Sequence, residues 1–291
     1  MSIVAFQGIP GAFSEEAVRQ VFNAPDLAPR NTFDAVFAAV ENGEADRAVV
    51  PIENAVFGSV HVNYDHLRAH AVTIVGELQL RIRHHLMAPP GASLDTLRTI
   101  HSHPQALGQC RTSLQTLAPQ ASTESAYDTA GAARDVAERD DASTAAIASR
   151  RAADRYGLRV LARGIEDDDQ NYTRFLVLAP SGTEAPAADE RGRKTSIAFA
   201  LCENVPGALF KSLAVFALRE LDLLKIESRP LVGHPGRYVF YLDIDGGTGD
   251  EAVTRALGHL DEISTEVHVL GAYPAGPMVD TNGGAAAEED G

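Results

Sequence analysis

A hydroxyl and a guanidinium stand side by side in this sequence, at Thr173 and Arg174, directly before an apolar run that begins at Phe175. Four acidic residues come shortly before them, at positions 166–169. Arginine offers a permanently charged fork that suits carboxylates, and threonine offers a neutral hydrogen-bond donor. The pair could therefore handle an anion at a strand entrance. Taken alone, an exposed strand start that is ion-paired to the preceding acids explains the same residues more simply.

A second polar pair, Glu53 and Asn54, follows an apolar strand pattern over residues 45–51. Open α/β sheets place their ligands at the carboxyl ends of such strands. The amide of Asn54 both donates and accepts hydrogen bonds, which suits orienting a substrate. An asparagine that only forms a turn is the alternative.

Further polar candidates lie in a short strand-to-helix segment. Ser102 ends a strand pattern and has capping-box spacing to Gln105, so helix capping alone could explain it. Gln109 follows four residues after Gln105 on the same helix face, where a partly buried amide needs partners. Near the N-terminus, a loop over residues 7–14 feeds a helix and could present free N–H groups to an anion; a plain tight turn is equally compatible with it.

The bulk composition limits the partners. The chain has 291 residues and a net charge of −15, so nucleic acid and anionic membranes are poor partners. No apolar run is long enough to span a membrane, and we see no signal peptide. Cys110 and Cys202 are isolated, which favours a reducing cytoplasm without disulfides or a zinc site. The adjacent His84 and His85 point to opposite faces of a strand and make a poor metal pair. We expect no metal and no cofactor.

Alternating strand and helix patterns predict α/β packing in two lobes. Residues 72–87 are too long for one ordinary strand and predict a crossing between lobes, with the stretch before Thr173 as the return crossing. The expected lobes are residues 1–76 with the strand after Thr173, and residues 88–162. Residues 1–180 then form one bilobal domain with the shape of a periplasmic binding protein.

A proline-, alanine- and charge-rich stretch at 181–194 predicts a linker. Residues 195–275 follow the order β-α-β-β-α-β, which indicates a ferredoxin-like domain. Residues 276–291 are small and acidic, and we expect them to be disordered.

Six short segments together make the sequence resemble the prephenate dehydratases, with a C-terminal ACT domain of the phenylalanine-sensing kind. They begin at Gly8, Pro51, Ser102, Thr173, Glu203 and Glu227, and read GIPGAFSE, PIEN, SHPQALGQC, TRF, ENVPGAL and ESRP. The family usually has valine where Phe210 stands, a change that we expect to be harmless or to tune the effector pocket slightly.

The resemblance implies a carbon–oxygen lyase of the hydro-lyase class that converts prephenate to phenylpyruvate, in phenylalanine biosynthesis, losing water and carbon dioxide. Thr173 would be the catalytic hydroxyl that eases the departing oxygen away. Arg174 would bind a substrate carboxylate, directly or indirectly. The remaining substrate-binding residues implied by the resemblance are Gly11, Ala12, Phe13, Ser14, Glu53, Asn54, Ser102, Gln109 and Phe175.

The resemblance also implies inhibition by L-phenylalanine, bound where two ACT domains meet in a homodimer or homotetramer. A loop of open N–H groups would take the effector's carboxylate, and Glu227 and Ser228 its ammonium. The effector residues implied are Asn204, Gly207, Ala208, Leu209, Glu227, Ser228, Arg229 and Pro230. A plain helix-entry turn is the alternative for the loop at 204–207.

Two other functions fit the same sequence. Arogenate dehydratase shares the fold and differs only in taking an amino group where prephenate has a keto group. A non-catalytic amino-acid sensor would share the bilobal shape, but such a binder has no need of the Thr173 hydroxyl beside Asn54 and Gln109.

Overall fold

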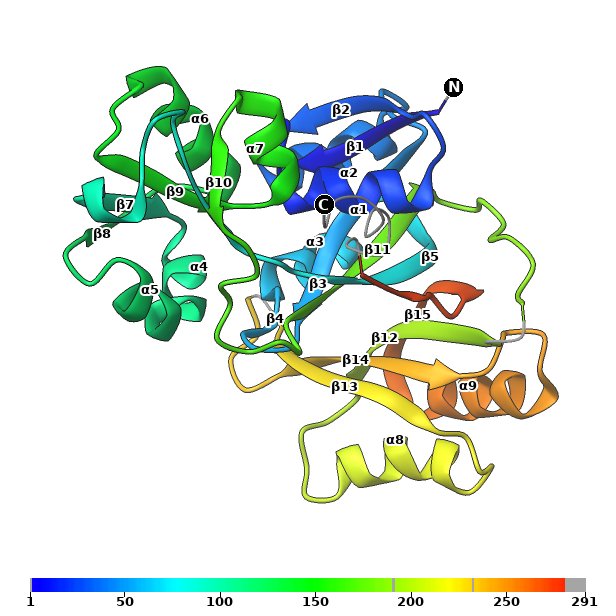
Figure 1. Cartoon of the computed structure of the whole chain (residues 1–291). Coiled ribbons are helices and arrows are strands. Elements are labelled where there is room, and N and C mark those ends of the chain that lie inside the picture. The colour runs from blue at the N-terminus through cyan, green and yellow to red at the C-terminus, as the bar shows by residue number, and fades with distance from the viewer. Residues whose placement is uncertain (1, 190–191, 232, 281–291) are drawn as a thin grey trace.

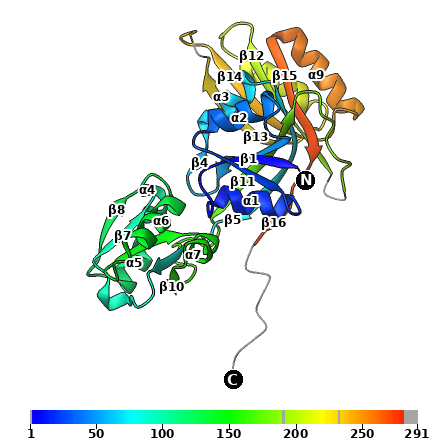
Figure 2. The same ribbon diagram turned by 90° about the horizontal axis from the view of Figure 1, so that it is seen from above.

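The computed structural model describes residues 2–189, 192–231 and 233–280. Three sheets organise them, of seven, five and four strands. We call the bodies built on these sheets lobe one, lobe two and the C-terminal domain (Figure 1). Seen from above, lobe one lies between the other two (Figure 2).

Lobe one has the strand order β16-β5-β11-β3-β1-β2, with β4 paired to β3. Its strands are β1 (Ile3–Gln7), β2 (Asp26–Arg30), β3 (Arg47–Asn54), β4 (Gly58–Ser59), β5 (Val72–Arg81), β11 (Tyr172–Pro180) and β16 (Met278–Val279). Its helices are α1 (Phe13–Val21), α2 (Phe33–Glu41) and α3 (His61–Ala69). Strands β1, β2 and β3 are parallel, and β11 runs antiparallel between β3 and β5.

Lobe two has the strand order β10-β6-β9-β7-β8. Its strands are β6 (His85–Ala88), β7 (Thr99–Ser102), β8 (Ser122–Ser125), β9 (Thr144–Ala148) and β10 (Arg159–Ala162). Its helices are η1 (Leu94–Thr96), α4 (Pro104–Gln109), α5 (Arg111–Leu117), α6 (Thr129–Arg139) and α7 (Arg150–Tyr156). The long stretch at 72–87 breaks between β5 and β6 and crosses from lobe one to lobe two, as predicted. Residues 163–171 carry the chain back.

The C-terminal domain is ferredoxin-like, with the antiparallel strand order β13-β14-β12-β15. Its elements are β12 (Arg193–Leu201), α8 (Ala208–Ala217), β13 (Leu223–Pro230), β14 (Tyr238–Asp245), α9 (Glu251–Ile263) and β15 (Ser264–Pro274). Phe199 and Phe216 lie in the core beneath α8 and α9, whereas Ala198 and Tyr241 join the core of lobe one. The predicted fold class is confirmed: a bilobal α/β unit resembling periplasmic binding proteins, followed by a βαββαβ domain.

The prediction of disorder from residue 276 is wrong for the first residues of the tail. Met278 and Val279 form β16, which pairs in parallel with β5 and covers its edge. Just before it, the Gly276 backbone N–H donates to Glu77 at 3.1 Å. Two residues give no periodicity to read, so the sequence could not indicate this strand. The predicted disorder of residues 281–291 lies outside the described residues.

The two faces of β11 enter different parts of the core. Phe175 and Val177 pack with α1, while Leu176 and Leu178 pack on the opposite face with α2, α3 and the C-terminal domain. Since side chains alternate along a strand, this pattern places Thr173 and Arg174 on opposite faces of the sheet.

A search of the helices in the described residues finds none that combines the length and the apolar composition needed to cross a membrane.

Candidate active site

A cavity of about 530 Å³ lies between the two lobes. Lobe one supplies the loop before α1, the end of β3 and the start of β11, and lobe two supplies the starts of α4 and α6. The sequence-predicted residues on its wall are Ala12, Phe13, Ser14, Asn54, Gln109, Thr173 and Phe175. The cleft therefore gathers segments that are more than a hundred residues apart.

A β-bulge decides which side chain stands beside Thr173. On β3, Pro51 pairs with Phe175, but Asn54 pairs with Thr173, so Ile52 is an extra residue. Without it, Glu53 would lie opposite Thr173 in place of Asn54. Bulges re-aim side chains in this way, often next to active sites.

Asn54 fixes the Thr173 hydroxyl from behind. Its Nδ2 donates to Thr173 Oγ1 at 2.9 Å and to Asn171 Oδ1 at 2.8 Å. Its Oδ1 accepts from the N–H groups of Val56 and Phe57, both at 3.0 Å, so the turn-forming interpretation also holds. The hydroxyl oxygen accepts from the amide, and no described residue accepts the hydroxyl proton. That proton is therefore available to a ligand in the cavity.

The opposite wall carries a histidine whose role the sequence did not indicate. His84 Nε2 lies 2.6 Å from Gln109 Oε1, which is the partner that the partly buried amide required. The His84 ring also packs edge-on against Phe13, at 5.4 Å between centroids. Burial lowers the pKa of His84, so the neutral ring donates from Nε2 to the Gln109 oxygen. The Gln109 amide nitrogen is then free to donate elsewhere.

Among the described residues that line the cavity there is no lysine or arginine. Partial positive charge comes instead from the N-terminus of α1, which has no side-chain cap. Its first turn also contains Glu15 and Glu16, and Glu15 is paired with Arg19. The N–H groups of Phe13 and Ser14 lack partners within the helix, and both residues line the cavity. Such a helix start can hold an anion. The site thus offers neutral donors, a helix N-terminus, aromatic surface and one carboxylate, that of Asp128.

Four predicted substrate-binding residues do not line the cavity. Ser102 is fully buried, and its hydroxyl donates to the Ile147 carbonyl at 2.7 Å. The capping interpretation of Ser102 is also wrong, because His103 caps α4. Gly11 joins the lobes: its carbonyl accepts from Ser149 at 2.7 Å, and with φ +97° a Cβ there would meet Ala152.

Glu53 and Arg174 are the other two, and both face the C-terminal domain. Glu53 pairs with Lys225 on β13 at 2.9 Å. Arg174 is buried between Glu77 on β5, at 2.7 Å, and Asp243 on β14. Burial opposes the charge of Arg174, but the two carboxylates outweigh it, so the pKa of the guanidinium is raised. In this structure Arg174 has no access to a substrate in the cleft.

A second hollow, of about 460 Å³, lies on the C-terminal domain between the start of α8 and strand β13. Of the predicted effector residues, it is lined by Asn204, Gly207, Ala208, Leu209 and Ser228. Glu227 and Arg229 alternate to the other face of β13. They contact lobe one, Glu227 at Ser59 and Arg229 at Asp65, so in this structure the Glu227 side chain faces away from the hollow. Pro230 does not line the hollow either.

Comparison with known proteins gives a consistent result. The family model described as prephenate dehydratase matches residues 4–183. Arogenate dehydratase/prephenate dehydratase 2 of Arabidopsis thaliana is 46% identical over 93% of this chain and 72% of its own length. The crystal structure of a prephenate dehydratase from Arthrobacter aurescens, titled as a complex with L-Phe, is 35% identical with a TM-score of 0.85, and covers 94% of this chain and 90% of its own.

Another structure of similar fold carries a different description. It is titled a novel type of quorum-quenching acylase, and is 36% identical with a TM-score of 0.86, over 94% of this chain and 98% of its own. The fold is thus shared by proteins with more than one described activity. From the family match over most of the bilobal unit and the identity to curated relatives, this chain belongs to the prephenate dehydratase family and is a dehydratase of the hydro-lyase type.

Proposed function

We propose that the chain converts prephenate to phenylpyruvate. The bond from the ring to its carboxylate breaks, so CO₂ leaves and the electron pair enters the ring. Hydroxide leaves the opposite ring carbon and takes up one proton from solvent to become water. The ring becomes aromatic, so the enzyme needs only to hold the dianion and assist the departing oxygen. Thr173 Oγ1 donates its hydrogen bond to that oxygen. A single aimed donor of this kind contributes about 10²–10³-fold in rate.

The observation that carries this proposal is the Asn54–Thr173 contact of 2.9 Å at the cavity wall. Because the Asn54 amide donates to the Thr173 oxygen, the hydroxyl keeps its own proton to donate to the ligand. An amide cannot accept the hydroxyl proton at this position, which argues against acyl transfer with Thr173 as nucleophile. Carboxylates would be held at the α1 N-terminus, and the ring would pack against Phe13 and Phe175.

Arogenate is the second candidate substrate, and Asp128 favours it. This residue lines the cavity, and one of its oxygens caps α6 by accepting from Gly131 at 2.6 Å. Its other oxygen has no hydrogen bond within the described residues and could receive the ammonium of arogenate. Curated relatives include arogenate dehydratases, such as that of Petunia hybrida at 44% identity.

The deciding experiment compares initial rates on prephenate and arogenate at matched concentrations. The proposal predicts a higher kcat/KM for prephenate, and Asp128→Asn should then alter the two values alike. A preference for arogenate that Asp128→Asn removes would make arogenate the substrate. Turnover of neither would overturn the proposal.

We further propose that L-phenylalanine binds the hollow beside α8 and inhibits, and that two C-terminal domains pair around it. Apolar side chains that line the hollow stand exposed, Phe210 at 74% and Val205 at 47%, as expected of a surface that a second copy covers. A rate that does not respond to phenylalanine would remove the regulatory proposal. Light scattering with and without phenylalanine gives the oligomeric state. The cytoplasmic location stays a prediction based on the isolated cysteines, and the Arabidopsis thaliana relative is named chloroplastic.

A further inference from the structure

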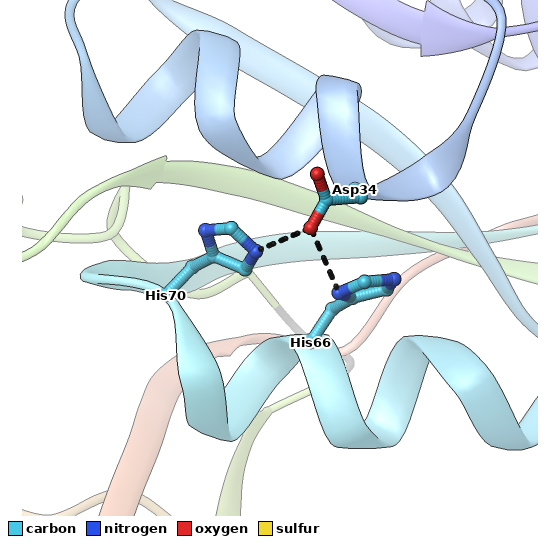
Figure 3. A group of neighbouring side chains, drawn as sticks. All are labelled: Asp34, His66 and His70. Carbon is cyan, nitrogen blue, oxygen red and sulfur yellow. Dashed lines mark ion pairs between the residues drawn. The ribbon is translucent and has the colours of Figure 1, made fainter.

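Away from the cleft, two histidines and an aspartate converge between helices α2 and α3. Asp34 lies in the first turn of α2, His66 lies in α3, and His70, four residues later, caps the C-terminus of α3 (Figure 3). One oxygen of Asp34 lies 3.9 Å from His66 Nδ1 and 3.5 Å from His70 Nε2. The three potential ligand atoms lie within 4.8 Å of one another. None of the three residues lines the cavity of the active site.

The second ring nitrogen of His70 is held by a carboxylate. His70 Nδ1 lies 2.8 Å from Glu41 Oε2, and the other oxygen of Glu41 accepts from the Ala71 N–H at 2.9 Å. This contact places the proton of a neutral imidazole on Nδ1, and so leaves a lone pair on Nε2 aimed at Asp34. A histidine that donates one N–H to a carboxylate and presents its other nitrogen is the usual arrangement at protein metal sites.

Packing restricts the rings but leaves the open side of the group accessible. The buried Phe37 ring lies 5.2 Å from the His66 ring and 5.6 Å from the His70 ring. The His66 and His70 side chains are 18% and 13% exposed, whereas that of Asp34 is 71% exposed. Two oriented nitrogens and one carboxylate therefore share a rim that water can reach.

From these contacts we infer that Asp34, His66 and His70 form a site for one borderline divalent transition metal, such as Zn²⁺ or Co²⁺, with water completing the coordination. Zinc bonds of 2.0–2.1 Å to nitrogen put tetrahedral ligand atoms about 3.3 Å apart. The Asp34 oxygen lies 3.5 and 3.9 Å from the two nitrogens, and the third pair of ligand atoms lies within 4.8 Å, so side-chain rotation has to bring the three atoms closer around the ion. Imidazole ligands favour zinc, cobalt or nickel over magnesium or calcium.

The bound metal cross-links α2 to α3. The residues of α3 also contact the C-terminal domain, Asp65 through Arg229 and Tyr64 through the Tyr241 hydroxyl. The site is thus structural: it fixes the helix on which the C-terminal domain rests, and it takes no part in the dehydration.

The test uses the full chain without a histidine tag, treated with chelator and dialysed. Titration calorimetry with ZnCl₂ should give about one saturable equivalent, and Co²⁺ should give the visible absorption of a tetrahedral centre. Zinc should also raise the melting temperature by at least about 3 °C. His70→Gln and His66→Gln should each abolish these signals, and Glu41→Gln should weaken binding about tenfold or more. His61→Gln is the matched control, because His61 lies on the same helix and outside the group.

Two results would overturn the inference. The first is the absence of saturable zinc binding to the folded wild-type chain. The second is zinc binding that His61→Gln removes as fully as His70→Gln, since the metal would then be held by surface histidines in general. Circular dichroism of each variant establishes that loss of binding does not come from loss of the fold.

Discussion

Thr173 and Arg174 are neighbours in one motif, yet they lie on opposite faces of β11, and the charged groups around the two faces differ. Thr173 faces a cleft whose described lining holds no lysine or arginine. Arg174 faces a buried cluster in which its guanidinium contacts Glu77, Asp243 and the Tyr273 hydroxyl. The guanidinium of Arg174 thus links lobe one to the C-terminal domain, and the neutral hydroxyl of Thr173 faces the cleft.

Arg174→Met should have the largest effect, a loss of unfolding free energy. It leaves two carboxylates buried without their cation, and removing one partner of a buried ion pair costs about 3–5 kcal/mol of unfolding free energy. Urea denaturation followed by circular dichroism measures the loss. In protein that remains folded, KM should change little. Arg174→Lys keeps the charge and should fall between wild type and Arg174→Met. Unchanged stability with a large rise in KM would return Arg174 to a substrate-binding role.

Thr173→Val tests the other face of the same strand. Valine keeps the shape and the strand preference of threonine but removes the donor, so kcat should fall about 10²–10³-fold while stability changes little. Thr173→Ser retains a hydroxyl and should recover most of the activity. The assay is product formation under saturating substrate. Turnover near the wild-type value in Thr173→Val would eliminate the proposed role of the hydroxyl.

The charged face also predicts a pH dependence of stability. Burial alone would raise the pKa of Glu77, but Arg174 and Lys194 outweigh burial and lower it below 4.5. A carboxylate with a lowered folded-state pKa stabilises the fold above its unfolded pKa, and that contribution disappears as pH falls through the folded value. Wild type should lose unfolding free energy below about pH 4.5, and Glu77→Gln should show a flatter decline from a lower value at pH 7. Parallel curves for the two proteins would contradict this assignment.

The smallest effect is expected at Glu227. Because its side chain contacts Ser59 and His61 of lobe one, Glu227→Gln should leave the affinity for L-phenylalanine within about twofold of wild type. Ala208→Leu, at a residue lining the hollow, is the contrasting variant and should weaken binding far more. Calorimetric titration with phenylalanine measures both. Equal losses in the two variants would place Glu227 at the effector after all.

The sequence predicted the lobes, both crossings and the ferredoxin-like order, because hydrophobic periodicity and turn residues are local signals. It also predicted that Thr173, Asn54 and Gln109 lie at one cleft. It could not predict the bulge at Ile52, which depends on how β3 pairs with a strand more than a hundred residues away. Nor could it predict that a second domain covers one face of β11, so Arg174 was assigned to the substrate. The C-terminal domain also explains why Glu53, expected at the substrate, instead pairs with Lys225.

The connectivity around β5 sets how the C-terminal domain can act on the cleft. The chain enters that domain from β11 and leaves it into β16, and these two strands are the neighbours of β5 on either side. The domain is therefore tethered at both of its ends to one strand, and that strand continues through Ile82 to His84 at the cavity wall. We therefore expect a displacement of the C-terminal domain to reach the cleft along β5, at the segment that carries His84.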